Sequence, residues 1–399
     1  MRFSRRTHWN IEANALESAR QRRLAAGLPL ADLTASNPTR CGFTYSSDLL
    51  EPLTNPSARD YDPNPRGRLQ AREAVCRYYE THNARISPDQ VILTTSTSEA
   101  YSYLFKLLCD PGETILAPRP CYPLFDFLAD AEVVTLTHAD FVYDHGWQLD
   151  IESLRRNITL QTRAIVLVHP NNPTGHFTRP EEARELAALC REHSLVLIVD
   201  EVFLDYSLTA TPSVRETFLA RDLGILTFVV SGISKIAALP QMKAAWLVAS
   251  GPGAADALER LEVLADTFLS MNVPIQSALP VWLDTRSAIQ SQIVSRVQIN
   301  LLALDTQLAD QSADHRWVSR LDLEGGWYAI LRIPAIEDDE TTAIHLLEEG
   351  VYIHPGSFFG LPSSGWLVVS FLTPPLDFEI GISTVIRHFQ ENHKNYLEI

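Results

Sequence analysis

Cysteine is scarce in this sequence, and its placement argues against two kinds of structure. The chain of 399 residues has five cysteines, and no two of them form a C-x-x-C pair. Because their number is odd and their spacing is wide, neither a disulfide framework nor a zinc site is indicated, and we expect no bound metal. A chain without disulfides suits a reducing compartment, so we expect the cytoplasm. The cysteines are Cys41, Cys76, Cys109, Cys121 and Cys190.

The sequence also lacks a long hydrophobic run. No stretch approaches the roughly 20 apolar residues of a membrane span, so we expect no membrane partner. The N-terminus, Met1–Arg6, is basic but is followed by Glu12 and Glu17 rather than by an apolar segment, which argues against a secretory signal. A mitochondrial transit peptide is an open alternative, and an amphipathic arm that ends near Gly27 is the simpler interpretation.

Blocks of like charge are absent as well. The formal net charge is −16 and is spread along the chain, so we expect no nucleic-acid partner and attribute the charge to solubility. Apolar residues make up 46% of the chain, which is typical of globular proteins. A chain of this length buries a large core and should form two domains, or one large domain with a smaller companion.

Short apolar runs are abundant from residue 91 onward, and they predict an α/β fold. Most of them are separated by helical patterns such as those at 99–108 and 179–193. Because the runs are continuous rather than alternating, their strands should be buried on both faces of a mostly parallel, seven-stranded sheet flanked by helices. Ligands of such sheets bind at the carboxyl ends of the strands. The runs lie at 91–95, 114–118, 133–137, 164–168, 195–199, 225–230 and 244–249.

The two ends of the chain predict a second, smaller α+β domain. We place a large domain at 46–285 and a small domain at 1–45 together with 286–399, joined by a long helical stretch near 286–310. The small domain should contain a cap that closes over a ligand. Its expected strands are 326–332, 351–354 and 366–371, with a helix at 340–349.

Polar side chains with distinct chemistry follow four of the expected strands. After the first strand, Ser96 and Glu99 have the spacing of a capping box, and Thr95 and Thr97 add hydroxyl groups at a helix start, where backbone N–H groups bind anions. After the fourth strand, the rigid turn His169–Gly175 aims an amide side chain. Taken alone, the first motif is an ordinary helix cap and the second an ordinary turn.

The next two strands end in an acid and a lysine. Asp200 ends the run Leu195–Val199, where a carboxylate is costly unless it is paired. Lys235 follows the run 225–230 in the loop Ser231–Lys235. A partly desolvated lysine has a lowered pKa and becomes a nucleophile, as Schiff-base chemistry requires. For a lone lysine, the alternative is a strand-end side chain that extends to water.

Together these groups suit pyridoxal phosphate, which has a phosphate, a ring hydroxyl, a ring nitrogen and an aldehyde. The order and spacing of Asn172–Gly175, Asp200–Val202 and Ser234–Lys235 are jointly specific. On these residues the chain resembles the class I/II aminotransferases, which are fold-type-I pyridoxal-phosphate enzymes. The resemblance covers essentially the whole length. It implies an aminotransferase that acts on an amino donor and a keto acid by ping-pong half-reactions.

The resemblance also implies a role for each matching residue at the cofactor ring. Lys235 matches the lysine that forms the Schiff base and moves the substrate proton. Asp200 matches the carboxylate that keeps the pyridine nitrogen protonated. Asn172 matches the amide that binds the ring hydroxyl, and Tyr122 matches the aromatic side chain stacked on the ring, although a core aromatic is the alternative for Tyr122.

Further matches concern the phosphate group. Thr95, Ser96 and Thr97 match the phosphate cradle, and Lys243 stands where the family usually has an arginine. Tyr61, six residues before Gly67, matches a tyrosine that reaches the phosphate of a partner subunit. The resemblance therefore implies a homodimer with shared active sites.

Several positions depart from the family pattern. Gly232 replaces a phosphate-binding serine, and Phe203 replaces a tyrosine that donates to the ring oxygen, a role for which Tyr206 is a conjectural substitute. The arginine that binds the substrate α-carboxylate falls on Val368. A charge-assisted bond contributes about 1.5–3 kcal/mol, so its absence should weaken the binding of an ordinary amino acid by one to two decades.

The loop Asp32–Thr39 contains the pair Asn37-Pro38 and supplies the candidates for substrate binding. We expect Asn37 near the substrate and Arg40 as the replacement cation, with an exposed surface arginine as the alternative for Arg40. Two other outcomes share the cofactor or its site. One is a lyase or decarboxylase, because the bond that breaks depends on how the substrate lies over the ring. The other is a pyridoxal-phosphate-binding protein with little catalysis.

Overall fold

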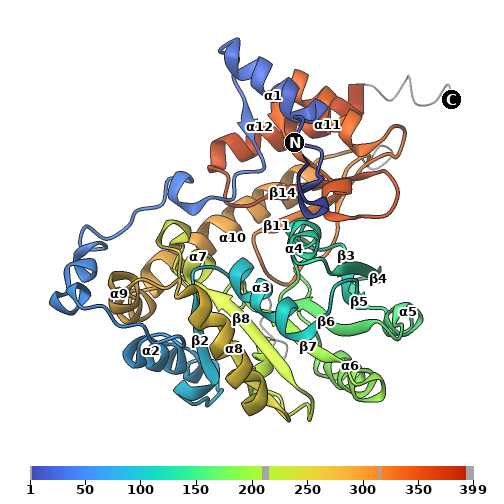
Figure 1. Cartoon of the computed structure of the whole chain (residues 1–399). Helices are drawn as coiled ribbons and strands as arrows, with labels where there is room; N and C mark the ends of the chain where they lie inside the picture. The colour runs from blue at the N-terminus through green and yellow to red at the C-terminus, as the bar shows by residue number, and fades with distance from the viewer. Residues whose placement is uncertain (1, 209–214, 313–315, 392–399) are drawn as a thin grey trace.

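The computed structural model describes residues 2–208, 215–312 and 316–391 of the chain. Figure 1 shows two groups of elements, with a large twisted sheet and its helices in one and a small sheet with α1, α11 and α12 in the other. The long helix α10 (Ser287–Ala309) runs between them. In the described part of the chain, no helix is both long enough and apolar enough to cross a bilayer.

The large sheet has eight strands in the order β2-β9-β8-β7-β6-β3-β4-β5. Neighbours from β8 through β4 are parallel, whereas β9 is antiparallel to β2 and β8, and β5 is antiparallel to β4. The predicted mostly parallel sheet is confirmed, with one strand more than the seven expected. The strands are β2 (Val91–Thr94), β3 (Thr114–Arg119), β4 (Thr135–Tyr143), β5 (Trp147–Leu149), β6 (Thr162–Val168), β7 (Val196–Asp200), β8 (Thr227–Gly232) and β9 (Ala245–Ser250).

Helices cover both faces of this sheet, which explains why its strands are apolar throughout. In β7, Leu197 and Val199 belong to one core cluster, while Ile198 between them belongs to another on the opposite face. Burying one such side chain stabilises the fold by about 1.5–3 kcal/mol. The first face packs on α2 (Leu69–Glu80), α6 (Pro180–His193) and α9 (Val273–Asp284), and the second on α3 (Thr97–Leu108), α4 (Leu124–Glu132) and α8 (Ala254–Phe268). The short helix α5 (Ile151–Asn157) packs beside β4.

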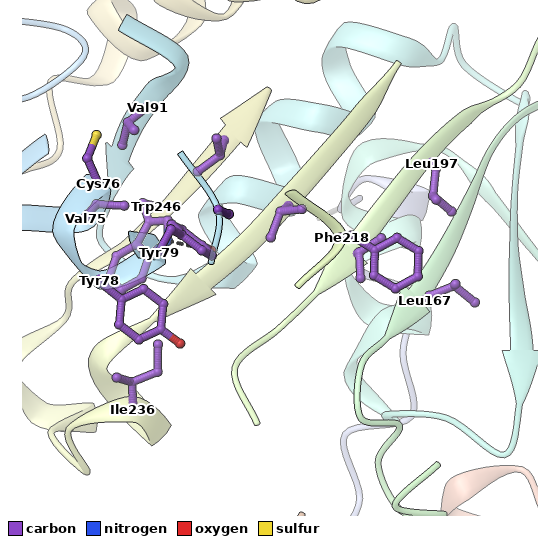
Figure 2. Close-up of a cluster of buried hydrophobic side chains, with 14 of the residues drawn as sticks. Val75, Cys76, Tyr78, Tyr79, Val91, Leu167, Leu197, Phe218, Ile236 and Trp246 are labelled. Atoms are coloured by element: carbon purple, nitrogen blue, oxygen red, sulfur yellow. Dashed lines mark hydrogen bonds between the residues drawn. The ribbon is translucent and has the colours of Figure 1, made fainter. Parts of the chain in front are cut away.

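Figure 2 shows part of the first cluster, where aromatic rings of α2 meet the sheet. Tyr78 and Tyr79 pack edge to face, with ring centroids 5.0 Å apart, and Tyr78 packs on Trp246 of β9. The indole N–H of Trp246 donates to the Tyr79 hydroxyl over 3.1 Å, so this polar pair is satisfied inside the core. The interlocked rings fix α2 against β9, the second strand of the sheet.

The second group is built around a four-stranded antiparallel sheet with the order β10-β11-β14-β13. A separate parallel pair, β1 with β12, joins the N-terminal segment to the C-terminal third of the chain. The residues of the eight-stranded sheet span 91–250 and those of the four-stranded sheet span 319–370, and the domain limits near 45 and 286 stay a prediction. The strands are β1 (Ala31–Asp32), β10 (Ser319–Arg320), β11 (Tyr328–Arg332), β12 (Val351–Tyr352), β13 (His354–Pro355) and β14 (Trp366–Ser370), with helices α1 (Ala15–Ala25), α11 (Asp339–Glu348) and α12 (Pro375–Glu391).

Candidate active site

The carboxyl ends of β6, β7 and β8 meet at one edge of the large sheet. Asp200, the last residue of β7, is in register with Val168 of β6 and Val230 of β8. The chain leaves β8 directly into the one-turn helix α7 (Ile233–Ile236), which carries Lys235. The structure therefore places the predicted acid and the predicted lysine at the same edge.

The Lys235 amine lies against aromatic rings. Its Nζ is 5.0 Å from the ring centroid of Trp327 and 5.7 Å from that of Phe203. Burial lowers the pKa of Lys235 to about 8, against the opposing effects of Asp200 and Cys41. At that pKa roughly a tenth of the amines are neutral and nucleophilic at pH 7, far more than for an ordinary lysine.

Asp200 is buried, with 7% of its surface exposed. Its Oδ1 accepts a hydrogen bond from the backbone N–H of Val202 and its Oδ2 accepts one from the Tyr101 hydroxyl, each over 3.0 Å. Burial raises the pKa of Asp200 to about 6, although both hydrogen bonds and Lys235 act in the opposite direction. A buried carboxylate of this kind is stabilised by a cationic partner, such as a protonated ring nitrogen.

Tyr101 is a site residue that the sequence did not reveal. It lies on α3, is almost fully buried, and contacts Phe125 with ring centroids 5.1 Å apart. Burial raises the pKa of Tyr101 well above its usual value, so the hydroxyl stays protonated and remains a donor to Asp200. Helical periodicity places Tyr101 on the face of α3 toward the sheet, but only the fold shows that Asp200 lies opposite.

Asn172 sits in a loop that closes on itself. The side chain of the preceding residue, Asn171, accepts from the Thr174 hydroxyl over 2.9 Å, and the Asn171 carbonyl accepts from Gly175 N–H over 2.8 Å. Gly175 has φ +72°, and a Cβ there would lie 2.6 Å from the Gly325 carbonyl oxygen. The buried Oδ1 of Asn172 has no hydrogen-bond partner among the described residues, so its amide group is available to a ligand.

The start of α3 carries the hydroxyl residues that were expected to bind a phosphate, with one difference in the cap. Ser96 Oγ accepts from Glu99 N–H over 3.1 Å, as predicted. The Glu99 carboxylate, however, accepts from the backbone N–H and hydroxyl of Thr95, at 2.7 and 3.1 Å, and from the Ser270 hydroxyl at 2.9 Å. The reciprocal bond of the capping box is therefore moved by one residue, and it fixes Thr95 beside Ser96 and Thr97 at the helix N-terminus.

Lys243 and Gly232 have different surroundings. Lys243 is exposed, has φ +51°, and its ammonium forms no ion pair within the described ranges. Gly232 is packed against β9: a Cβ there would lie 2.8 Å from Ala245 Cβ and 3.0 Å from the Ala244 carbonyl oxygen. Close packing of the two strands therefore explains the glycine, and a hydroxyl at this position requires β9 to move.

The two tyrosines expected at the cofactor differ in their position. Tyr122 is 42% exposed, packs edge-on against Phe125 and is close enough to Asp200 for that charge, together with burial, to raise its pKa. Tyr61 is 80% exposed and lines a surface cavity of about 400 Å³ together with Met271.

The loop after β1 contains the expected Asn37 and Arg40 and, next to them, a buried cysteine. The Asn37 Oδ1 caps a short 3-10 helix by accepting from the N–H and hydroxyl of Thr39, and Arg40 is exposed. Cys41 is 2% exposed and interacts electrostatically with Lys235 and Tyr328. The loop therefore faces the lysine through Cys41.

Two further departures from the family pattern, Phe203 and Val368, lie in closely packed surroundings. Phe203 is buried against Trp327, with ring centroids 5.3 Å apart. The Tyr206 hydroxyl donates to the Lys235 carbonyl oxygen over 2.6 Å, so the conjecture that Tyr206 replaces the missing ring-oxygen donor is wrong. Val368 is fully buried on β14, in register with Ile330.

Comparison with known proteins agrees with this geometry. The family model described as aminotransferase class I and II matches residues 53–377. An alanine aminotransferase of Mycobacterium tuberculosis is 30% identical over 360 residues, which cover 85% of this chain and 80% of that protein. Glutamate-pyruvate aminotransferase AlaA of Escherichia coli is 27% identical over 380 residues, 92% of each chain.

Solved structures show the same fold along the whole chain. A crystal structure of an aminotransferase from Escherichia coli superposes with a TM-score of 0.86 at 25% identity and covers 98% of both chains. An alanine aminotransferase from Pyrococcus furiosus superposes with a TM-score of 0.85 at 21% identity, over 98% of this chain and all of that one. The chain therefore belongs to the family of class I and II aminotransferases.

Proposed function

We propose that this chain transfers an amino group from an amino donor to a keto acid by ping-pong half-reactions, with pyridoxal 5′-phosphate held at Lys235. The observation that carries the proposal is the juxtaposition of a lysine of lowered pKa with a buried carboxylate that has no cationic side chain in hydrogen-bond contact among the described residues. When bound, the cofactor supplies an electron sink for the carbanion formed at the substrate Cα.

The residues present fit the groups of the cofactor. The unpartnered amide oxygen belongs to Asn172, whose side chain would meet the ring hydroxyl. Asp200 would hold the ring nitrogen in its protonated form, and the half-exposed ring of Tyr122 would cover the ring face. Because Phe203 has no hydroxyl, Asn172 would be the side chain that supports the ring oxygen.

In this proposal the Lys235 amine accepts and releases the proton of the substrate Cα. Its pKa of about 8 lies near the operating pH, where a group both accepts and releases a proton efficiently. The aromatic wall of Phe203 and Trp327 keeps water from the amine on that side. The proton at the substrate Cα would therefore be taken up by the amine rather than lost to solvent.

The phosphate and the second subunit belong to the same proposal. Thr95, Ser96 and Thr97 would bind the phosphate at the N-terminus of α3, with the exposed Lys243 as the adjacent cation. Tyr61 is largely exposed and would reach the phosphate of a second copy, which makes the active unit a homodimer. The five cysteines are free thiols, in keeping with a reducing cytoplasm.

The substrate carboxylate needs a partner other than Val368. Arg40, exposed next to the buried Cys41, is the proposed cation, and Asn37 lies at the start of the same turn. One charge-assisted contact of this kind contributes about 1.5–3 kcal/mol to substrate binding.

Two measurements on the purified protein test the proposal. Borohydride reduction of the cofactor-loaded protein should attach the cofactor to Lys235, as read by peptide mass, and K235A should show no attachment. A panel of amino donors, added without a keto acid, should bleach the visible absorbance by converting the cofactor to its pyridoxamine form. Release of ammonia or carbon dioxide would instead indicate a lyase or decarboxylase. No response to any donor would indicate a binding protein with little catalysis.

A further inference from the structure

His176 is a buried, doubly paired histidine that the proposed chemistry does not use. It is 2% exposed, and its Nε2 lies 2.9 Å from Glu182 Oε2. Its Nδ1 lies 3.6 Å from Glu324 Oε2, an ion-pair distance rather than a hydrogen bond. Burial alone would lower the pKa of His176, but the two carboxylates outweigh it and the pKa is raised, which favours the charged form of the imidazole.

Both carboxylates are fixed by further contacts. Glu182, in the first turn of α6, accepts from Arg179 N–H over 2.6 Å and from Leu149 N–H over 2.8 Å. Glu324 accepts from Phe177 N–H over 3.2 Å and pairs with the Arg179 guanidinium. Two acids, a histidine and an arginine thus form a small, partly buried cluster, in which each carboxylate accepts a backbone hydrogen bond as well as pairing with a basic side chain.

This cluster joins two segments that are far apart in the sequence. On one side, His176 ends the loop that carries Asn172, because the His176 carbonyl accepts from Asn171 N–H over 2.8 Å. On the other side, Glu324 donates its backbone N–H to the Gly175 carbonyl over 3.3 Å and lies three residues before Trp327. The loop with the free amide and the segment that carries Trp327 are therefore joined by the His176–Glu324 ion pair in addition to backbone hydrogen bonds.

We propose that His176 is a positioning residue that locks the Asn172 loop to the segment carrying Trp327, and so sets the amide at a fixed distance from the Lys235 amine. The proposal rests on the proposed function, because the position of Asn172 matters to catalysis only if its amide meets the cofactor ring. A histidine with a purely structural role would affect the stability of the fold without a specific effect on cofactor binding.

Two variants separate these roles, with a matched control. H176Q removes the ionisable imidazole and its ion pair with Glu324, and E324Q weakens the same link from the other side if H176Q folds poorly. The control H388Q removes a comparable pair on α12, where the buried His388 lies 2.6 Å from Glu349 in the second group of elements. All three should lower the melting temperature to a similar extent.

Only the cluster variants should change the site. In the apoprotein, amide hydrogen exchange of segments 171–177 and 325–328 should become faster in H176Q and E324Q but not in H388Q. The dissociation constant for pyridoxal phosphate should rise about tenfold and kcat should fall with it, because small displacements of positioned groups are costly. Unchanged exchange and an unchanged dissociation constant in both cluster variants, beside an equal loss of melting temperature, would overturn the inference.

The two readouts also distinguish a failure of the proposed function. If the wild-type protein binds no pyridoxal phosphate, the proposed function fails. The exchange data on the apoprotein still show whether His176 couples the two segments.

Discussion

The Tyr101 hydroxyl donates to the Asp200 carboxylate over 3.0 Å, across the contact between α3 and the end of β7. A donor that stays protonated stabilises the ionised form of the acid, so Tyr101 opposes the effect of burial on the pKa of Asp200. The charge proposed to hold the cofactor ring nitrogen thus depends on a residue that need not touch the cofactor.

Replacement of that tyrosine should shift a pH dependence. In Y101F the pKa of Asp200 should rise further above about 6, by roughly one unit, because a hydrogen bond to a charged group contributes about 1.5–3 kcal/mol. Cofactor affinity should fall on the acid side of its pH profile, and the midpoint of this acid limb should rise by the same amount. The profile is measured by titrating the apoprotein with the cofactor between pH 5 and 8. Y79F removes a buried hydroxyl on the other face of the sheet and should leave the limb in place. An unmoved limb in Y101F would contradict the coupling.

The same carboxylate should make the apoprotein less stable as the pH rises. The pKa of Asp200 is about 6 in the folded chain against a usual value of 3.8, so between about pH 4 and pH 6 the folded chain holds a proton that the unfolded chain has lost. The free energy of unfolding therefore falls over this range, by about 3 kcal/mol from this residue. Apo D200N should melt a few degrees higher than the wild type at pH 7 and at the same temperature near pH 4. A lower melting temperature of D200N at pH 7 would show that the carboxylate is better paired than the structure indicates.

The close packing at Gly232 predicts a stability cost with a specific remedy. In G232S the new Cβ would lie 2.8 Å from Ala245 Cβ, and overpacking of this kind costs about 1–3 kcal/mol. The companion change A245G removes the opposing atom, so G232S/A245G should recover part of the melting temperature that G232S loses, beyond the sum of the single changes. Thermal melts of the four proteins measure this coupling, and strict additivity would be inconsistent with the contact.

The proposed substrate cation has a kinetic signature. R40A should raise the KM for the amino donor about 10- to 100-fold with a smaller effect on kcat, because the contact to the carboxylate is made in the bound substrate and in the transition state alike. Steady-state kinetics with the best donor of the panel measure both constants. R296A is not a suitable control, since its guanidinium holds the Cys41 carbonyl, but R77A on α2 is. A KM that does not change in R40A would remove Arg40 from the site.

The sequence predicts the sheet and its functional edge because both depend on local patterns. Continuous apolar runs mark strands buried on two faces, and the polar residues that end them, Asp200 and Lys235, are brought together by parallel pairing alone. The eighth strand, β5, was missed because it has three residues and an exposed glutamine at its centre. A segment this short has no periodicity to read.

The side chains around Lys235 and Asp200 come together through long-range packing. No local pattern in the sequence shows which distant residues will meet. Trp327 contacts the Lys235 amine from a segment more than 90 residues further along the chain, and Tyr101 reaches Asp200 across a helix–sheet interface. Both residues are buried aromatics, and many ordinary core residues are too, so their type alone does not mark them as part of a site. Their roles follow only from the register of elements that meet in space.

The contact between the Gly175 and Gly325 backbones, where neither residue has room for a side chain, bears on how the enzyme matures. The two glycines are separated by about 150 positions in the sequence. Contacts between residues so far apart have a high entropic cost of loop closure and therefore tend to form late in folding. A nascent chain that has formed only the large sheet would still lack the segment with Gly325 and Trp327, which lies beside the Lys235 amine. The ability to bind the proposed cofactor would then be gained late in folding.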